Sequence, residues 1–599
     1  MADASLVFRP YMALLPVGGL YVATLARLLT VQGLPQPGAE ETVRGIVGRD
    51  TVLQAPRGAL LDRNGLVLAE DRPVWNLVMD APARTRRWLQ ELEHGGGVAA
   101  QLEARVALQE LAVAAGGDAA AWERWVLDAR LTRRVLARDL SEIEAARARA
   151  ALEDCAGNGL RLERGWRRAY PQGRALAHAI GLPANADGER AASGLEAACE
   201  PLLINQDGRR RSLRVAGDHG VDPMLGFEPA GERAAVRTAL DAALAAFARV
   251  ELAEAQAKFK AASACAVALD VRTGDVLMIE AVPDYDPNAP GEGMQTRKIR
   301  GKVETVGWMM PALWPLEPGS SVKPFVIASA LQAGLLSETE RFENHGGTWR
   351  IPHSKRTIHN ASEVPQHAMT PHEILQHSSN IGAAQVGMRL GAQRMKRLWL
   401  DLGVQQGPGL EVFDKERGLF PTDSAWNKSN AGPWTVASTA FGHEFSLTPL
   451  RLGFAWAALV NGGVLLEPRW FQDQPVKPVR RVFEEATAKK VTGWVESVVS
   501  GRKDKLLPSW EDLRWGGKSG TAQKLHTTGY TTFFVAFGPV EIPEVVVIVA
   551  VEDPTAGKVR GSIICGPPAG RILRRALELR GTLTPHLDSD SPRAKVLPR

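Results

Sequence analysis

A serine and a lysine three residues apart stand at the start of an apolar segment in the second half of the chain. The motif S-S-V-K runs from Ser320 to Lys323 after a Pro-Gly pair typical of a turn, and the apolar spacing that follows predicts a helix. Residues three apart on a helix share a face, so the Ser320 hydroxyl and the Lys323 amine are expected to meet. A serine becomes a nucleophile when a base takes its proton, and a lysine serves as that base when burial and nearby cations lower its pKa.

A second polar motif, S-S-N, contains Ser378 and Asn380 and follows a run with helical spacing. A serine hydroxyl and an asparagine amide two residues apart can line one cleft, where they relay a proton and orient a substrate amide. A polar break between two helices explains the same residues without any function.

A third motif, K-S-G-T, comprises Lys518, Ser519, Gly520 and Thr521 and precedes the apolar run YTTFFVAFGPV. A strand edge at this point would offer backbone groups to an extended peptide, and Gly520 would let that backbone approach closely. Lys518 supplies a positive charge, and the two hydroxyl groups supply donors for a carboxylate.

Each motif by itself is weak, since roughly two chance matches to S-x-x-K are expected in a chain of this length and composition. Their order is the specific signal. Serine acyl-transfer enzymes that react with penicillin contain the motifs S-x-x-K, S-x-N and K-T-G in this same order along the chain. The third motif here reads K-S-G, which keeps the hydroxyl.

The elements around these motifs predict an α/β or α+β domain, with a sheet sandwiched by helices. Residues 240–262 have the pattern of one long helix. Two apolar runs, ACAVALDV and GDVLMIEAV, are predicted to form a hairpin about the turn at 272–274. The runs YTTFFVAFGPV and EVVVIVAVED are predicted strands, and 569–580 a closing helix.

The first half of the chain has a different pattern. An Asn-Gly turn at 62–65 between apolar runs predicts a hairpin, and 98–152 predict two or three amphipathic helices. Residues 11–33 form an apolar stretch long enough to cross a bilayer if Arg27 reaches an interface. A cleaved signal peptide is the alternative, and the lack of a clear small-x-small cleavage site favours an anchor. Arg9 favours a cytoplasmic start.

Composition excludes few functions. The formal net charge is +5, and no basic block alternates with aromatic residues as a nucleic-acid surface requires. The four cysteines lie far apart, which favours buried apolar roles, while Cys155–Cys199 or Cys265–Cys565 pairing stays open. Six of the twelve histidines lie between Ser320 and Ser378, but their spacing is not that of a zinc site, and no metal or cofactor is expected. The histidines in this segment are His345, His353, His359, His367, His372 and His377.

Beyond these motifs, the chain resembles the class B penicillin-binding proteins over nearly its whole length. Residues 57–69, 167–181 and 193–203 resemble the amino-terminal pedestal of that family, and 282–288 and 439–463 resemble its catalytic domain. The resemblance implies a serine transpeptidase/β-lactamase-like α/β (α+β) domain, preceded by an elongated α+β pedestal and one transmembrane helix.

The resemblance also implies domain boundaries. These are a cytoplasmic stub at 1–10, an anchor at 11–33, the pedestal or dimerisation-like domain at 34–235, the penicillin-binding transpeptidase domain at 236–583 and a tail at 584–599. It places the protein in the inner membrane as a single-pass protein, with the catalytic domain on the periplasmic side.

Residue roles follow from the resemblance as well. Ser320 would attack the penultimate D-alanine of a stem peptide, Lys323 would act as the base, and Ser378 and Asn380 would assist. Lys518, Ser519, Gly520 and Thr521 would bind the substrate, and the backbone N–H groups of Ser320 and Thr521 would hold the oxyanion. The amine of a second stem peptide would then complete the cross-link.

The partners implied are peptidoglycan stem peptides, β-lactams as covalent inhibitors, the membrane, and a polytopic glycan polymerase with other elongation or division proteins. No nucleic acid is expected. A D,D-carboxypeptidase shares the acylation step and stays an alternative, as does a non-catalytic β-lactam-binding scaffold or sensor. A β-lactamase would not usually carry a large pedestal.

Overall fold

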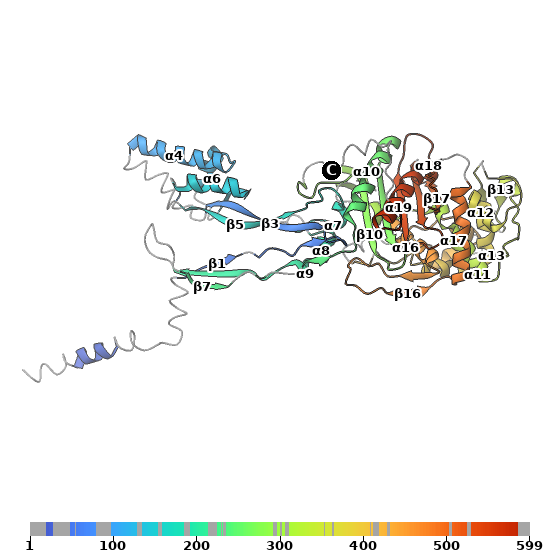
Figure 1. The fold of residues 1–599 in the computed structure, drawn as a ribbon, viewed down its shortest axis with the longest axis horizontal. Coiled ribbons are helices and arrows are strands. Elements are labelled where there is room, and N and C mark those ends of the chain that lie inside the picture. The colour runs from blue at the N-terminus through green and yellow to red at the C-terminus, as the bar shows by residue number, and fades with distance from the viewer. Residues whose placement is uncertain are drawn as a thin grey trace, which may run out of the picture. The chain divides into compact units, whose positions relative to one another are not determined.

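The fold is that of a computed structural model, in which two compact units are distinguished (Figure 1). One unit comprises 1–57, 72–167 and 204–232, and the other comprises 58–71, 168–203 and 233–599. The structure describes residues 19–27, 48–53, 55–79, 85, 97–128, 134–153, 159–184, 192–213, 224–228, 231, 235–290, 296–299, 302–305, 311–352, 354–361, 364–407, 409–410, 418–427, 432–501, 506–523 and 529–584.

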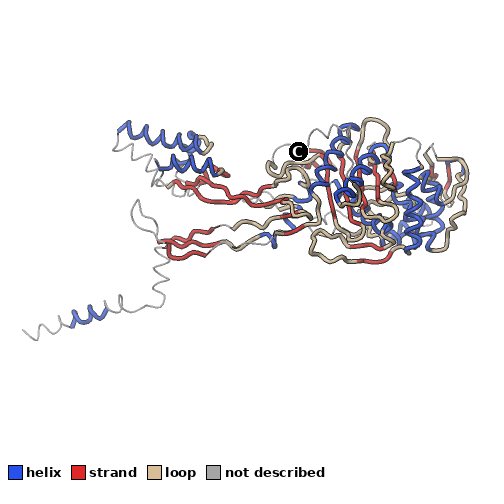
Figure 2. The backbone as a smooth tube through the Cα atoms, viewed as in Figure 1, coloured by secondary structure: helices blue, strands red, loops and turns tan. Residues whose placement is uncertain are grey.

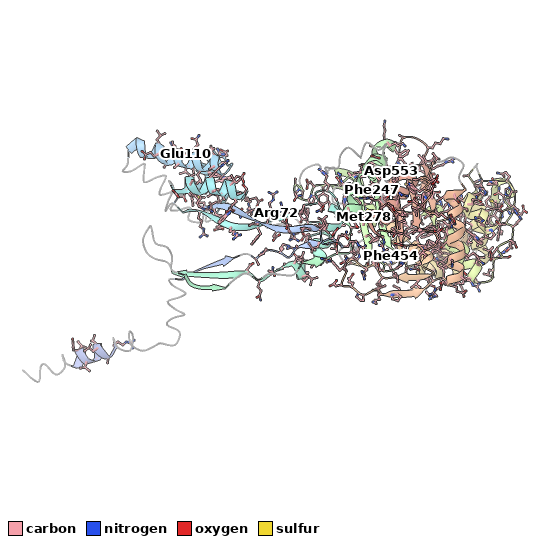
Figure 3. All side chains as sticks on the ribbon, in the orientation of Figure 1. Arg72, Glu110, Phe247, Met278, Phe454 and Asp553 are labelled. Carbon is pink, nitrogen blue, oxygen red and sulfur yellow. The ribbon has the colours of Figure 1, made fainter. Side chains whose placement is uncertain are left out.

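The described part of the first unit contains a three-stranded antiparallel sheet and a helical layer. The sheet has the order β1-β6-β7, from Gly48–Leu53, Gly208–Leu213 and Met224–Glu228. The helices α4 (Gly97–Ala114), α5 (Ala119–Leu127) and α6 (Glu142–Glu153) pack with β3 (Val67–Met79) and β4 (Arg134–Leu140). Glu110, labelled in Figure 3, lies on α4.

The helices expected over 98–152 are therefore present, but β4 interrupts them, and that expectation was wrong at this point. The sequence RVLARDL of β4 has no alternation of polar and apolar residues strong enough to mark a strand. Its pairing with β3, from Trp75↔Leu140 to Met79↔Arg134, holds it in place. Buried Trp122 and Val126 of α5 belong to the core of this unit.

The second unit is built on a five-stranded antiparallel sheet (Figure 2). Its strands follow the order β10-β9-β19-β18-β17, from Val276–Val282, Ser263–Asp270, Val545–Glu552, Tyr530–Gly538 and Gly516–Gln523. The central strands β9 and β19 are buried at every position, which requires helices on both faces. This confirms the expected α+β sheet-and-helix domain.

Helices cover the sheet from two sides. α10 (Ala242–Phe259) and α19 (Gly566–Leu579) pack against each other and against the sheet. α16 (Pro449–Val460) packs against β9 and β19, where a Cβ at Gly453 would lie 2.8 Å from Leu269 Cδ1. Phe454 of α16 and Met278 of β10, both labelled in Figure 3, belong to this core.

Both predicted hairpins are confirmed. At 62–65 the Asp62 carboxylate accepts hydrogen bonds from the N–H groups of Asn64 and Leu66, each at 2.8 Å, and β2 (Leu60–Leu61) pairs with β3. At 272–274 the Asp270 carboxylate accepts hydrogen bonds from the N–H groups of Arg272 and Thr273, at 2.8 and 3.0 Å, and Gly274 adopts φ 75°. The predicted helix at 240–262 corresponds to α10, which Asp241 caps.

Other expectations fall partly outside the described residues. Of the anchor expected at 11–33, the structure describes a helix over 19–27 only, and no helix within the described residues is long and apolar enough to cross a membrane. The stub at 1–10, residues 585–599 of the tail, His353 and Cys155 also lie outside. Cys199, Cys265 and Cys565 are buried free thiols, which agrees with the buried apolar roles that the sequence favoured, and the Cys265–Cys565 pairing that it left open is not formed.

Candidate active site

The segment that carries Ser320 is a tight turn that opens a helix. The 3-10 helix η3 (Gly319–Val322) leads directly into α11 (Lys323–Gln332). Side chains three apart in a 3-10 helix eclipse one another, which places Ser320 and Lys323 on one face. Ser320 is partly exposed, whereas its neighbours Gly319 and Ser321 are buried. Of the two serines in the motif, Ser320 therefore has the more accessible hydroxyl.

Two other segments hold this turn. Gly319 adopts φ 54° and donates its N–H to the carbonyl of Gly442 at 3.1 Å. The buried indole of Trp456 donates to the Ser321 carbonyl at 3.2 Å, and the Ser321 hydroxyl donates to the Pro318 carbonyl at 2.7 Å. The residue before the motif and a residue within it are thus fixed by separate contacts.

Lys323 is fully buried, and its amine is surrounded by acceptors. Nζ donates to the Ser378 carbonyl at 2.6 Å and to Asn380 Oδ1 at 2.8 Å, and it lies 3.3 Å from Ser378 Oγ. Burial lowers the pKa of Lys323 well below its usual value, and the nearby positive charge of Lys518 lowers it further. The structure therefore provides an amine that favours the neutral form, as a general base requires.

Ser378 lies at the junction of two helices. α12 (Pro371–His377) ends at this residue, and α13 (Asn380–Asp401) begins after Ser379, whose hydroxyl accepts the Gly382 N–H at 3.0 Å. Ser378 itself is left-handed, with φ 60° and ψ 39°. A non-glycine residue in this region costs on the order of 1 kcal/mol, and such strain often occurs at functional sites. The conformation directs its hydroxyl towards both lysines.

Lys518 lies on β17, which forms one edge of the five-stranded sheet. Its side chain is buried, and Nζ donates to Ser378 Oγ at 2.8 Å and to the Ser519 carbonyl at 3.3 Å. The Ser378 hydroxyl thus contacts both lysine amines. The structure brings Lys323, Ser378, Asn380 and Lys518 into one hydrogen-bonded group.

The remaining residues of the third motif lie beside the Ser320 turn. A Cβ on Gly520 would be 2.5 Å from the Pro318 carbonyl oxygen, so only glycine allows the strand to pass this close. Ser519 and Thr521 are partly exposed, alternating with buried neighbours. The Thr521 hydroxyl accepts the Gly561 N–H at 3.2 Å, a contact that the sequence did not suggest.

Asn360 is a positioning residue that the sequence analysis missed. Its Oδ1 accepts the backbone N–H groups of Asn380 at 2.7 Å and Ile381 at 3.1 Å, and its Nδ2 contacts Ser379 Oγ at 3.2 Å. Asn380 Nδ2 in turn donates to the His359 carbonyl at 3.0 Å. These contacts join a loop residue to a helix start 20 residues later, so no local pattern marked it.

Three of the histidines of 345–377 contact different partners in the described structure. His345 stacks on Trp349, His359 contacts Thr348 at 3.2 Å, and His372 contacts Ser497 at 2.8 Å. Among the described residues, no group of three or more histidine, cysteine or acidic side chains could hold a metal ion.

Comparison with known proteins gives relatives over most of the chain. A Neisseria meningitidis serogroup A protein named probable peptidoglycan D,D-transpeptidase PenA is 29% identical over 588 residues, which cover 95% of this chain and 92% of that protein. The Escherichia coli K12 peptidoglycan D,D-transpeptidase FtsI is 28% identical over 427 residues, covering 69% and 68% of the two chains.

Solved structures share the fold. Penicillin-binding protein 2X from Streptococcus thermophilus has a TM-score of 0.69 at 18% identity, with 89% of this chain and 81% of that one covered. A peptidoglycan synthetase from Bifidobacterium adolescentis has a TM-score of 0.63 at 20% identity, with coverage of 90% and 98%.

Two family models match the chain. The penicillin-binding protein dimerisation domain matches residues 52–211, and the penicillin-binding protein transpeptidase domain matches 264–566. The second match spans half of the 599 residues and contains every residue of the three motifs. Together with the relatives above, it shows that this chain belongs to the class B penicillin-binding proteins.

Proposed function

We propose that this protein is a peptidoglycan D,D-transpeptidase that cross-links stem peptides through an acyl group on Ser320. The observation that carries the proposal is the buried Lys323 amine, which lies among Ser378, Asn380 and Lys518 at the helix start that carries Ser320. The names of the PenA and FtsI relatives support the same activity.

In the proposed acylation step, neutral Lys323 takes the proton of Ser320, whose Oγ attacks the carbonyl carbon of the penultimate D-alanine. The N–H groups of Ser320 and Thr521 stabilise the oxyanion, and the terminal D-alanine leaves with a proton passed through Ser378. Lys518, Ser519 and Thr521 bind the substrate carboxylate, and Gly520 permits the close approach of β17. An acceptor amine then displaces Ser320 from the acyl group.

We further propose that residues 11–33 anchor the chain in the cytoplasmic membrane, with the pedestal at 34–235 and the transpeptidase domain at 236–583 outside the cytoplasm. The apolar composition of 11–33 supports the anchor. The family match at 52–211 supports a pedestal that precedes the catalytic domain.

Labelling with a fluorescent penicillin tests the function. We expect the purified full chain to form a covalent adduct, and Ser320→Ala to abolish it, because Ser320 is the partly exposed serine of the turn that leads into the helix of Lys323. Ser321→Ala is the matched control for a neighbouring serine, and it should still be labelled.

Folded wild-type protein that is not labelled, or an adduct that persists in Ser320→Ala, would contradict the proposal. A donor peptide supplied with and without an amine then separates transpeptidation from hydrolysis. Release of D-alanine without any amine adduct would favour the carboxypeptidase alternative.

A further inference from the structure

The segment before Ser320 is bound to a second loop, which carries His443 and Glu444. Glu317 accepts the Glu444 backbone N–H at 3.0 Å through one carboxylate oxygen, and the other oxygen lies 3.3 Å from His443 Nδ1. The adjacent Gly442 carbonyl accepts the Gly319 N–H at 3.1 Å. Glu444 is therefore fixed beside the nucleophile turn.

Arg356 lies near the S-x-N motif, as Glu444 lies near the Ser320 turn. It lies in the connection between the short strands β13 (Thr348–Arg350) and β14 (Thr357–His359), which pair antiparallel. Three residues later, the carbonyl of His359 accepts a hydrogen bond from Asn380. Arg356 is thus attached to the side of the site that carries Asn380.

The two side chains meet across these segments. Arg356 Nη1 lies 3.6 Å from Glu444 Oε1, and their side chains are 61% and 31% exposed. An ion pair this long and this exposed contributes little to stability and exchanges readily for other partners. The pair therefore joins the Ser320 side of the site to the Asn380 side without locking them together.

Each charge is also held by contacts that do not depend on the other. The Arg356 guanidinium lies 4.6 Å from the ring centroid of Trp434, a cation–π arrangement. Glu444 adopts a left-handed backbone with φ 64°, which its bond to Glu317 maintains. When the pair opens, the Arg356 guanidinium keeps its contact with Trp434 and the Glu444 backbone keeps its bond to Glu317, and opposite charges held close together favour a ligand that carries both.

We infer that Arg356 and Glu444 bind the acceptor of the transfer reaction, and that this acceptor is an amine with a carboxylate on the same carbon. The inference rests on the proposed transpeptidase function. Arg356 binds the carboxylate, because its planar guanidinium suits that group, and Glu444 accepts hydrogen bonds from the arriving ammonium. A ligand of this type replaces the ion pair between Arg356 and Glu444 with two ion pairs, one from its carboxylate to Arg356 and one from its ammonium to Glu444.

The transfer step balances without a further reactant. The ammonium loses one proton to solvent, and the neutral nitrogen attacks the carbonyl carbon of the acyl-Ser320 ester. The C–N bond forms and the bond between that carbon and Ser320 Oγ breaks. The second proton of the nitrogen passes through Lys323 to Ser320 Oγ, which restores the free hydroxyl.

Partitioning of the acyl-enzyme between two acceptors tests the inference. The full chain is given an acyl-D-alanine thioester as donor and either D-alanine or D-alaninamide, which lacks the carboxylate. The ratio of amide product to hydrolysis product is measured, with the rate of penicillin labelling as a record of acylation. Wild-type protein should favour D-alanine.

We expect Arg356→Gln to lower the ratio of amide product to hydrolysis product about tenfold when D-alanine is the acceptor, because a charged hydrogen bond is lost. The ratio should then equal that for D-alaninamide. The rate of penicillin labelling should not change. Glu444→Gln should lower the ratio for both acceptors. The control is Arg350→Gln, which removes an exposed arginine from the same hairpin and should change neither measurement.

Equal ratios of amide to hydrolysis product for the two acceptors in wild-type protein would overturn this inference but not the proposed function. An unchanged ratio in Arg356→Gln would have the same meaning. Loss of penicillin labelling in a folded Arg356→Gln protein would also overturn it, because the pair would then hold the site together rather than bind an acceptor. Failure of wild-type protein to label would instead overturn the proposed function.

Discussion

At the residue scale, the site depends on two lysines that share one serine hydroxyl. Lys323 and Lys518 are both buried, and both contact Ser378 Oγ, at 3.3 Å and 2.8 Å. Two cations so close disfavour each other, and the one in the less polar environment loses its proton first. Burial and the Lys518 charge both lower the pKa of Lys323, which supports its proposed role as the base.

The pH dependence of acylation tests this assignment. Because Lys323 must be neutral to act, the second-order rate of penicillin acylation should rise as pH rises through its lowered pKa. In Lys518→Met one cause of the lowering is removed, so the pKa rises and the ascending limb should move to higher pH. Stopped-flow measurement of the rate across the pH range records the limb.

A matched control for that experiment is Lys489→Met, which removes an exposed lysine from α17 (Glu485–Ser500). Its profile should coincide with that of wild-type protein. If Lys518→Met lowers the rate by the same factor at every pH, the Lys518 charge does not tune Lys323, and its role is restricted to binding.

At the element scale, the start of α13 positions both Ser378 and Asn380, and Asn360 fixes that start. Asn360→Ala removes the acceptor for two backbone N–H groups, a loss of about 1–3 kcal/mol for a buried unsatisfied donor. We expect the acylation rate to fall about tenfold or more and the melting temperature to drop. The rate of fluorescent penicillin labelling and thermal unfolding measure the two effects.

Lys355→Ala, at an exposed position in the loop before β14, is the control and should leave both quantities unchanged. A stable Asn360→Ala protein with wild-type acylation would show that the Asn380 position does not depend on this contact.

Glu280 on β10 gives a second test at this scale, through a buried carboxyl group. Its Oε2 accepts the Leu176 N–H at 2.8 Å, and burial raises its pKa to about 8 despite that bond. A carboxyl with a raised folded pKa binds a proton that the unfolded chain releases, so its contribution is full below about pH 4.5 and is lost as pH rises through about 8.

The free energy of unfolding, measured by circular dichroism, should therefore decrease between about pH 5 and 8 in wild-type protein. The decrease should be steeper than in the Glu280→Gln variant. The substitution keeps a carbonyl oxygen for Leu176 but does not titrate. Parallel stability curves for the two proteins would mean that Glu280 does not change its protonation on unfolding.

At the scale of the whole molecule, the parts that the sequence predicted are those with a local cause. The turns at 62–65 and 272–274 follow from an Asp, Asn or Gly at a fixed place, and α10, β18 and β19 from long apolar patterns. The three motifs were found because their order is specific.

The parts that were missed depend on contacts between distant segments. β4 exists because β3 lies beside it, and Asn360 matters because α13 begins next to it. The ion pair of Arg356 with Glu444 joins residues 88 positions apart in the sequence, so neither residue type nor local spacing indicated it. The sequence therefore indicated which residues belong to the three motifs, but not the contacts that position them.

The proximity of Lys518 to Lys323 has a consequence for ligand binding as well. The Lys518 charge lowers the pKa of Lys323, so an anion that binds Lys518 offsets part of that lowering and raises the proton affinity of Lys323. Binding of an anionic ligand at Lys518 is therefore coupled to proton uptake by the protein, and an uncharged analogue of the same shape lacks this coupling.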